Sequence, residues 1–179
     1  MNRASGQTLQ AKAHSLNYGW VVMGFFWGLG LIDPIAAVSQ GVMLPTMTKD
    51  LDISPLQAGM LGAALFLGSA LVSLPSSIWL SRYSPKTITF LSVFLVGITM
   101  LIQGWAPTFG ILLAARFLYI MAAASRIQAE VLLIYQWFTP RQIAVVLSIS
   151  IGVMSIGQMV AVGLTPYLLI LLSGWRNVY

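Results

Sequence analysis

The chain has 179 residues, of which 58% are apolar and 7% are charged, and its mean hydropathy is +0.87. A soluble domain carries nearer a quarter of charged residues, so this composition predicts an integral membrane protein. The formal net charge is +5. The basic residues are mostly scattered singly at the ends of apolar runs, a pattern that indicates membrane topology and argues against a nucleic-acid partner. The absence of cysteine excludes disulfides, thiol catalysis and cysteine metal sites.

The chain begins with a polar segment and then turns apolar. Residues 1–17 contain Arg3, Lys12 and the only histidine, His14, but no acid, and we expect a cytoplasmic tail here. Residues 18–47 predict a first transmembrane helix, bent or broken near Asp33-Pro34 because proline lacks a backbone N–H. A signal peptide cleaved near residues 37–39 is the alternative. It is disfavoured because the apolar run continues beyond that point.

Four further apolar segments follow, separated by short polar turns. We expect spans at about 55–80, 86–105, 108–138 and 143–173, and residues 174–179 as a turn into a missing sixth helix. Glycine and alanine recur in the second and fifth spans at spacings that let helices approach closely in lipid. The sequence therefore predicts an all-α membrane protein, a helical bundle over residues 18–173 with five transmembrane helices plus the start of a sixth.

The distribution of lysine and arginine predicts the orientation. With a cytoplasmic N-terminus, one side of the membrane holds five bases and the other holds two: Arg3, Lys12, Arg82, Lys86 and Arg141 against Lys49 and Arg176. Because cytoplasmic loops carry an excess of these residues, we expect the N-terminus inside the cell.

The fourth expected span carries a polar stripe. At 100° per residue, five of its side chains fall within about 80° of one another and extend over roughly 20 Å: Arg116, Tyr119, Ala123, Arg126 and Glu130. A charge near the bilayer centre costs from about 3 to more than 10 kcal/mol, so such residues face a partner or a wet cavity.

Two ion pairs follow as hypotheses from depth and spacing. Asp33 lies roughly 15 Å before Met43 in the first helix, and Arg116 lies about 12 Å below the outer start of the fourth, so the two could pair at similar depth. Arg126 and Glu130 are four residues apart and could pair with each other. Arg116 is then either an anion-binding or gating residue or a structural partner of Asp33. Glu130 is either a proton relay or a neutralising partner of Arg126.

Five motifs, in order along the chain, resemble the major facilitator superfamily. They are Gly41–Pro45 with Asp50–Ser54 and Gln57–Gly59, the loop Ser77–Lys86, Arg116-Phe-Leu, Trp137–Arg141 with Ala144, and Gly174-Trp-Arg176. The last two are similar to the organic-anion and nitrate/nitrite branches. Ser77, Ser81 and Ser84 stand where the family usually has Gly, Asp and Gly, and serine cannot reproduce the gating contacts of that aspartate.

The resemblance implies the N-terminal half of a twelve-helix secondary transporter, with solute held between two six-helix halves near the membrane midplane. We expect transport of a small anionic solute at the cell membrane (the inner membrane in a bacterium). The candidate substrate-binding or coupling residues are Asp33, Arg116, Tyr119, Arg126 and Glu130, and the candidate gating-loop residues are Arg82 and Lys86.

The implied partners are the lipid bilayer, the solute, and a second half that comes from a C-terminal continuation, another chain or a second copy. The alternative function is a truncated, non-transporting membrane scaffold that binds another membrane protein. An enzyme is not expected, because the sequence has no Ser/His/Asp set, metal cluster or phosphate loop, and no cofactor is expected either.

Overall fold

The computed structural model describes residues 3–76, 78 and 82–178, with only the backbone described for residues 3–17. Within these residues the chain forms five helices that are long and apolar enough to cross a membrane, and no strand. They are α1 (Arg3–Asp50), α2 (Pro55–Ser73), α4 (Pro85–Trp105), α5 (Phe109–Trp137) and α6 (Pro140–Leu171), followed by a short 3₁₀ helix, η1 (Trp175–Val178). The expected all-α membrane fold is confirmed.

Three of the helices begin with the same local device, a serine or threonine followed by proline. Ser54, Ser84 and Thr139 occupy the N-cap positions of α2, α4 and α6, and a proline takes the first helical position each time. Proline fits there because its missing N–H has no intrahelical partner at that position anyway. The backbone N–H groups of Ser54 and Thr139 each donate to a glutamine three residues on. This capping places residues 140–142 in the first turn of α6, where the sequence predicts a turn.

Helix α1 continues through Pro34 and Pro45, so of the bend or break expected near Asp33-Pro34, the break does not occur. Pro34 has no N–H to offer the carbonyl of Gly30, the residue four positions earlier. Helix α6 approaches α1 closely at this place. A Cβ atom added at Gly157 would lie only 2.8 Å from the Gly30 carbonyl oxygen. Farther along the same pair of helices, the Thr165 hydroxyl donates to Ser39 Oγ at 2.8 Å.

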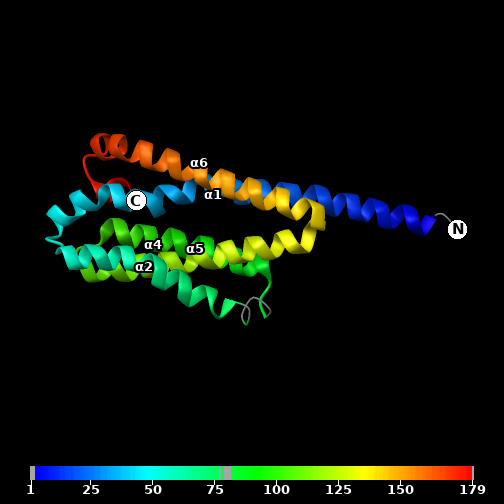
Figure 1. Cartoon of the computed structure of the whole chain (residues 1–179), viewed down its shortest axis with the longest axis horizontal. Helices are drawn as coiled ribbons and strands as arrows, with labels where there is room; N and C mark the ends of the chain where they lie inside the picture. Colours follow the sequence, from blue (N-terminus) through cyan, green and yellow to red (C-terminus); the bar gives the residue numbers. More distant parts are fainter. Residues whose placement is uncertain (1–2, 77, 79–81, 179) are drawn as a thin grey trace.

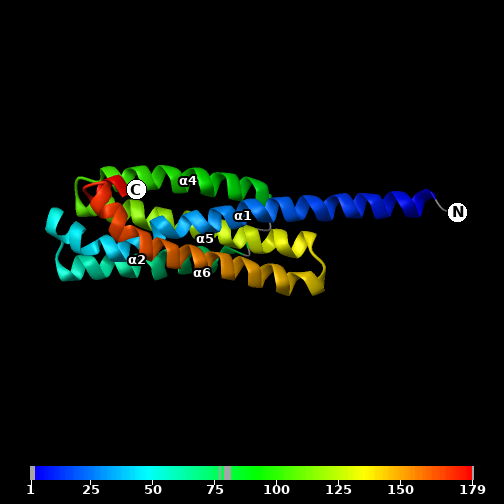
Figure 2. The same ribbon diagram turned by 90° about the horizontal axis from the view of Figure 1, so that it is seen from above.

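The helices form two layers. Helices α1 and α6 lie side by side in one, and α5 packs between α4 and α2 in the other (Figures 1 and 2). The N-terminal part of α1 projects beyond the bundle, at the same end as the α2–α4 connection and the α5–α6 turn (Figure 1). Two predicted positions, Ser77 and Ser81, lie outside the described residues, as does the end of the second expected span.

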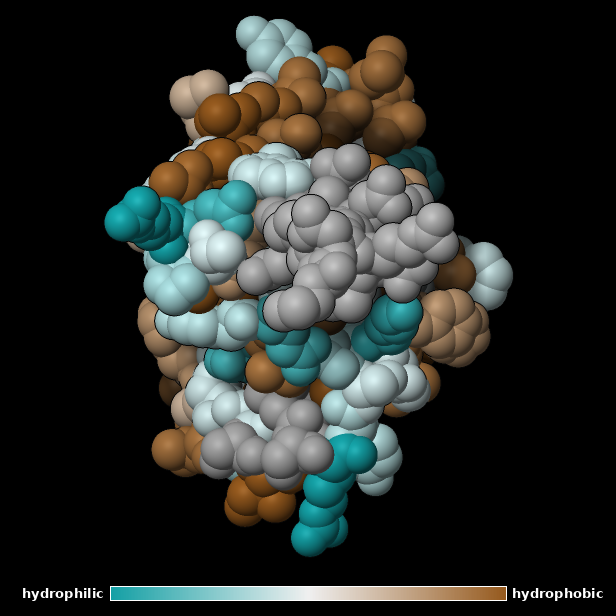
Figure 3. Space-filling view, turned by 90° about the vertical axis from the view of Figure 1, so that its right-hand side faces the viewer, coloured by the Kyte–Doolittle hydropathy of each residue, from teal (hydrophilic) through white to brown (hydrophobic). Residues whose placement is uncertain are grey.

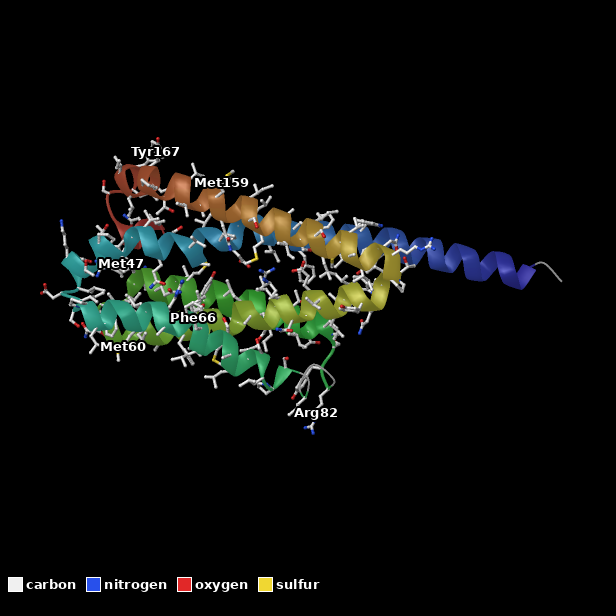
Figure 4. The ribbon with its side chains drawn as sticks, in the orientation of Figure 1. Met47, Met60, Phe66, Arg82, Met159 and Tyr167 are labelled. Atoms are coloured by element: carbon white, nitrogen blue, oxygen red, sulfur yellow. The ribbon has the colours of Figure 1, made fainter. Side chains whose placement is uncertain are left out.

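The side chains are distributed as a bilayer requires. Large apolar residues cover the outer faces, among them Phe66, and Met159 and Tyr167 point away from the bundle (Figure 4). Several polar side chains are buried instead: Ser39, Gln40, Ser92, Thr99, Gln103, Arg116, Arg126 and Thr165. Seen from the end where α1 emerges, hydrophilic residues gather on the tip of the bundle, with apolar ones toward its edges (Figure 3).

The opposite end is closed by a polar junction. The Asp50 carboxylate at the end of α1 pairs with Arg176 of η1 and accepts a hydrogen bond from Trp175 Nε1 at 3.0 Å. The Arg176 guanidinium also lies over the Trp175 ring, 4.6 Å from its centroid. These contacts tie the chain that follows α6 back to the end of α1.

Candidate functional site

A cavity of about 260 Å³ lies between α1, α5 and α6, across the two layers. Its wall is mostly apolar. The polar and ionisable side chains in it are Trp27 and Asp33 of α1, Tyr119, Arg126 and Glu130 of α5, and Ser150 and Gln158 of α6. Apolar walls with a few convergent polar groups are the usual composition of a small-molecule site. Four of the five predicted substrate-binding or coupling residues are in this wall, and Arg116 is not.

The ion pair of this cavity joins α1 to α5. One terminal nitrogen of Arg126, Nη2, donates to the carboxylate of Asp33. The Arg126 residue is 5% exposed, and its other two guanidinium nitrogens, Nε and Nη1, have no hydrogen-bond partner among the described residues. A guanidinium offers five N–H donors in a planar fork that suits carboxylates and other oxyanions. Arg126 is therefore a buried cation with donors still to be satisfied.

A hydrogen-bonded chain links all three helices on another side of the cavity. Trp27 Nε1 donates to Ser150 Oγ at 2.9 Å, and the Ser150 hydroxyl donates to Glu130 Oε1 at 2.9 Å. A serine hydroxyl has one proton and two acceptor lone pairs. Because Trp27 can only donate, Ser150 must accept from it and is left to donate to the Glu130 carboxylate. These two hydrogen bonds hold the Glu130 carboxylate toward α6.

Arg116 lies about 15 Å nearer the start of α5 than Arg126 and is bound to backbone atoms of α1. Its two terminal nitrogens donate to the carbonyl oxygens of Ala36 at 3.1 Å and Ala37 at 2.7 Å. The hydroxyl of Tyr119 donates to the Asp33 carbonyl oxygen at 3.3 Å. The Arg116 guanidinium also lies 5.3 Å from the centroid of the Tyr119 ring. Arg116 and Tyr119 thus fasten α5 to α1 beside the cavity.

Both predicted ion pairs are replaced by other contacts. Asp33 pairs with Arg126 instead of Arg116, and Glu130 accepts from Ser150 instead of pairing with Arg126. The reason for the first change lies in the helix ends. Helix α1 extends to Asp50, so Asp33 lies about 25 Å from that end, which is also the distance of Arg126 from the start of α5 at Phe109. The depth estimated from the apolar run alone places Asp33 too near the membrane surface.

The predicted gating-loop residues lie elsewhere. Arg82 and Lys86 are exposed at the α2–α4 connection, and neither lines the cavity (Figure 4 labels Arg82). Within the part of the chain that the structure describes, no group of three or more histidine, aspartate or glutamate side chains could hold a metal ion.

Sequence reasoning missed Ser150. Isolated serines are common in membrane helices, so the residue type alone does not indicate that Ser150 lines a cavity. Its position does carry one, because Ser150 precedes Gly157 by seven residues and so lies on nearly the same face of α6. That face packs against α1, since Gly157 meets Gly30 and Leu31.

A comparison with protein families finds one match. The model of the Major Facilitator Superfamily matches residues 26–179, which include every residue that lines the cavity. No curated protein and no solved structure shows significant similarity to the chain.

Proposed function

Because this chain belongs to the Major Facilitator Superfamily, a family of multi-pass membrane transporters that are in general not enzymes, we propose that it moves a small anionic solute across the membrane together with a proton. In this family, transport proceeds by alternating access, in which two halves rock about a site near the membrane midplane. The cavity between α1, α5 and α6 is the proposed solute site.

The observation that carries the proposal is the state of Arg126. Its guanidinium is nearly fully buried in the cavity wall, with Nη2 on Asp33 and with Nε and Nη1 unsatisfied among the described residues. A buried donor without a partner costs free energy, more so when the group is charged. A carboxylate or another oxyanion supplies acceptors in the geometry that a guanidinium fork prefers. An anionic solute would therefore complete the hydrogen bonding of Arg126.

The charges in the cavity wall support coupling to protons. With Asp33, Arg126 and Glu130 all ionised, the three lining groups sum to one negative charge, which opposes the entry of an anion. Protonation of Glu130 removes that charge. The Ser150 hydroxyl can then accept from Glu130 as well as from Trp27, so that its own proton becomes available to the solute. Proton and anion would thus bind together.

The proposed function also requires a membrane location and an orientation of the N-terminus. We place the protein in the cell membrane with a cytoplasmic N-terminus, supported by the excess of basic residues at that end of the bundle. A reporter fused after Leu16 should lie in the cytoplasm, and a signal from outside the cell would mean that the orientation is the reverse.

The second wall of the pathway would come from a C-terminal continuation, another chain or a second copy.

Uptake into vesicles tests the proposal. The chain is reconstituted at many copies per vesicle, and uptake of labelled nitrate and small monocarboxylates is measured with and without an inwardly directed proton gradient. We expect the gradient to drive uptake and the double variant D33N/R126Q, which removes both buried charges together, to abolish it. R141Q, an exposed change of the same kind, is the control.

Two results would overturn parts of the proposal. Uptake that survives in D33N/R126Q would remove Arg126 from solute binding. Uptake that ignores the proton gradient in the unsubstituted protein, and is unchanged in E130Q and S150A, would leave anion transport standing and exclude proton coupling through Glu130.

A further inference from the structure

A second hollow lies on a different side of α5, between α4 and α5. It is an open groove of about 530 Å³. Its α5 residues are Leu118, Met121, Ala122 and Ser125. They lie about 60–160° around the helix from Tyr119, whose side chain is in the wall of the central cavity. The groove therefore opens away from the proposed solute site.

The groove has a floor of small side chains and walls of large apolar ones. Ser92 and Ala122 in the floor are 5% and 3% exposed, whereas Leu91 and Leu118 along the walls are 62% and 45% exposed. Two small residues facing each other leave a channel where a leucine pair would close it. A channel with apolar sides, open along its length to the lipid, fits a flexible hydrocarbon chain.

The length and depth of the groove match one leaflet of a bilayer. It runs from Tyr83, just before α4, to Leu95, about 15 Å beyond the start of that helix. The hydrocarbon core of a bilayer is about 30 Å thick, so the groove begins at the membrane surface and ends near the middle. It covers the depth of one acyl chain and does not cross into the other leaflet.

The shallow end of the groove is basic. Tyr83 and Thr87 bring two hydroxyl groups to it, and the neighbouring Arg82 and Lys86 are exposed. The whole sequence contains four acidic residues, and none is available here to neutralise these bases. Asp33 and Glu130 line the central cavity, and Asp50 and Asp52 are at the opposite end of the bundle. Positive charge without compensation beside an apolar channel is complementary to an anionic head group on a hydrocarbon tail.

We propose that this groove is a binding site for an anionic phospholipid. One acyl chain lies between α4 and α5 over Ser92 and Ala122. The phosphate lies at the surface, where Arg82 and Lys86 supply charge and the Tyr83 hydroxyl supplies a hydrogen-bond donor. The Thr87 hydroxyl, which is 2.8 Å from Ser84 Oγ, can accept from Ser84 and donate to the phosphate. The site is independent of the proposed transport function, because it shares no residue with the central cavity.

Contact quenching tests this site, and the absence of cysteine makes the experiment direct. L91C, in the groove wall, is labelled with a fluorophore, and F25C, an exposed position on α1 in the other layer, is the matched control. Each labelled protein is placed in vesicles of mixed phosphatidylglycerol and phosphatidylcholine, with one lipid or the other brominated. The ratio of the two quenching efficiencies measures the local preference for the anionic lipid.

Each basic residue near the surface attracts anionic lipid by about fivefold. With Arg82 and Lys86 together, we expect a preference for phosphatidylglycerol of up to about 25-fold at position 91, and nearly none at position 25. R82Q/K86Q should bring the preference at position 91 close to that at position 25, and R141Q, at the same end but in the other layer, should leave it unchanged. All these residues are exposed, so the variants should fold.

Three outcomes would overturn the proposal. Equal quenching by both lipids at position 91 would mean that the groove does not select a head group. An equal loss of preference in R141Q would assign it to the charge of the whole surface. The absence of quenching by either lipid would mean that protein covers the groove, as in contact with a second copy of the chain.

Discussion

At the scale of single residues, the cavity depends on how the charge of Arg126 is balanced. Asp33 neutralises it through one nitrogen. In a low-dielectric interior, removing one member of such a pair leaves the other charge buried and uncompensated, whereas removing both leaves no charge at all. This asymmetry allows a structural ion pair to be separated from two residues that merely lie near each other.

We therefore expect D33N and R126Q each to lower the free energy of unfolding by about 3 kcal/mol, and the double variant D33N/R126Q to lower it by less than about 1 kcal/mol. Reversible unfolding in mixed micelles measures all three values. A second cycle that combines D33N with R116Q should show a smaller coupling energy, because the guanidinium of Arg116 donates to the carbonyl oxygens of Ala36 and Ala37. Strictly additive losses in D33N/R126Q would contradict the pair.

The sequence predicts which residues are polar inside the membrane more reliably than it predicts their partners. The stripe on α5 follows from the 100° step of a helix, and Tyr119, Arg126 and Glu130 do line the cavity. Pairing needs the register between two helices, which depends on where each one begins. Counted from Met43, Asp33 lies near the level of Arg116, but counted from the end of α1 at Asp50 it lies at the level of Arg126. No local pattern in residues 48–50, beyond the expected end of the first span, indicates that the helix continues to Asp50.

At the scale of helices, the sequence likewise predicts which helices pack closely but not which glycines make the contacts. The second and fifth expected spans are rich in small residues, which correctly indicates close packing but not the points of contact. In α2, Gly68 meets Ile120 of α5, whereas a Cβ atom at Gly59 or Gly62 would meet nothing within 4 Å. In α6 only Gly157, of the three glycines, has backbone so near that a side chain would collide. The tertiary arrangement selects one position from a repeated pattern.

Gly157 gives a prediction with an internal control. G157A places a methyl group 2.8 Å from the Gly30 carbonyl oxygen and 3.0 Å from Leu31 backbone atoms, which cannot move as a flexible side chain could. We expect a loss of about 1–3 kcal/mol in the free energy of unfolding, as in other overpacked interiors. G163A, in the same helix with open space around it, should be neutral or stabilising by up to about 1 kcal/mol, from helix propensity. Equal effects of the two changes in mixed-micelle unfolding would exclude close packing at Gly157.

At the scale of the whole molecule, the described residues form two layers, and the mostly apolar cavity between them has helices on three sides, α1, α5 and α6. The five-helix bundle and its apolar exterior are predictable from composition and hydropathy, because a bilayer admits few other backbone arrangements. The family match over residues 26–179 adds a transporter-type function in general. The identity of the solute depends on contacts in a complete pathway, which composition does not encode.

The alternating-access mechanism of the family bears on whether a single copy of residues 1–179 can transport a solute. In this family one half rocks against the other around a midplane site, and the two halves are parallel repeats about an axis along the membrane normal. A five-helix bundle offers one wall of such a pathway. Ile127 and Ile151, both in the cavity lining, are 38% and 67% exposed, as expected for a wall that meets another surface. We therefore expect a single copy not to transport, and a parallel pair of copies to be geometrically allowed.

Dilution during reconstitution separates these cases. The purified chain is incorporated at ratios from many copies to at most one copy per vesicle, and uptake of nitrate and small monocarboxylates is measured per chain. If copies must pair, uptake per chain should fall steeply once vesicles hold one copy, because a monomer leaves the charges of Asp33, Arg126 and Glu130 without a second wall. Covalent tandem linkage of two copies should restore uptake at the same dilution, which controls for loss of protein. Saturable uptake from vesicles that hold one unlinked copy would mean that this bundle forms a complete pathway, and the two-walled mechanism would not apply to it.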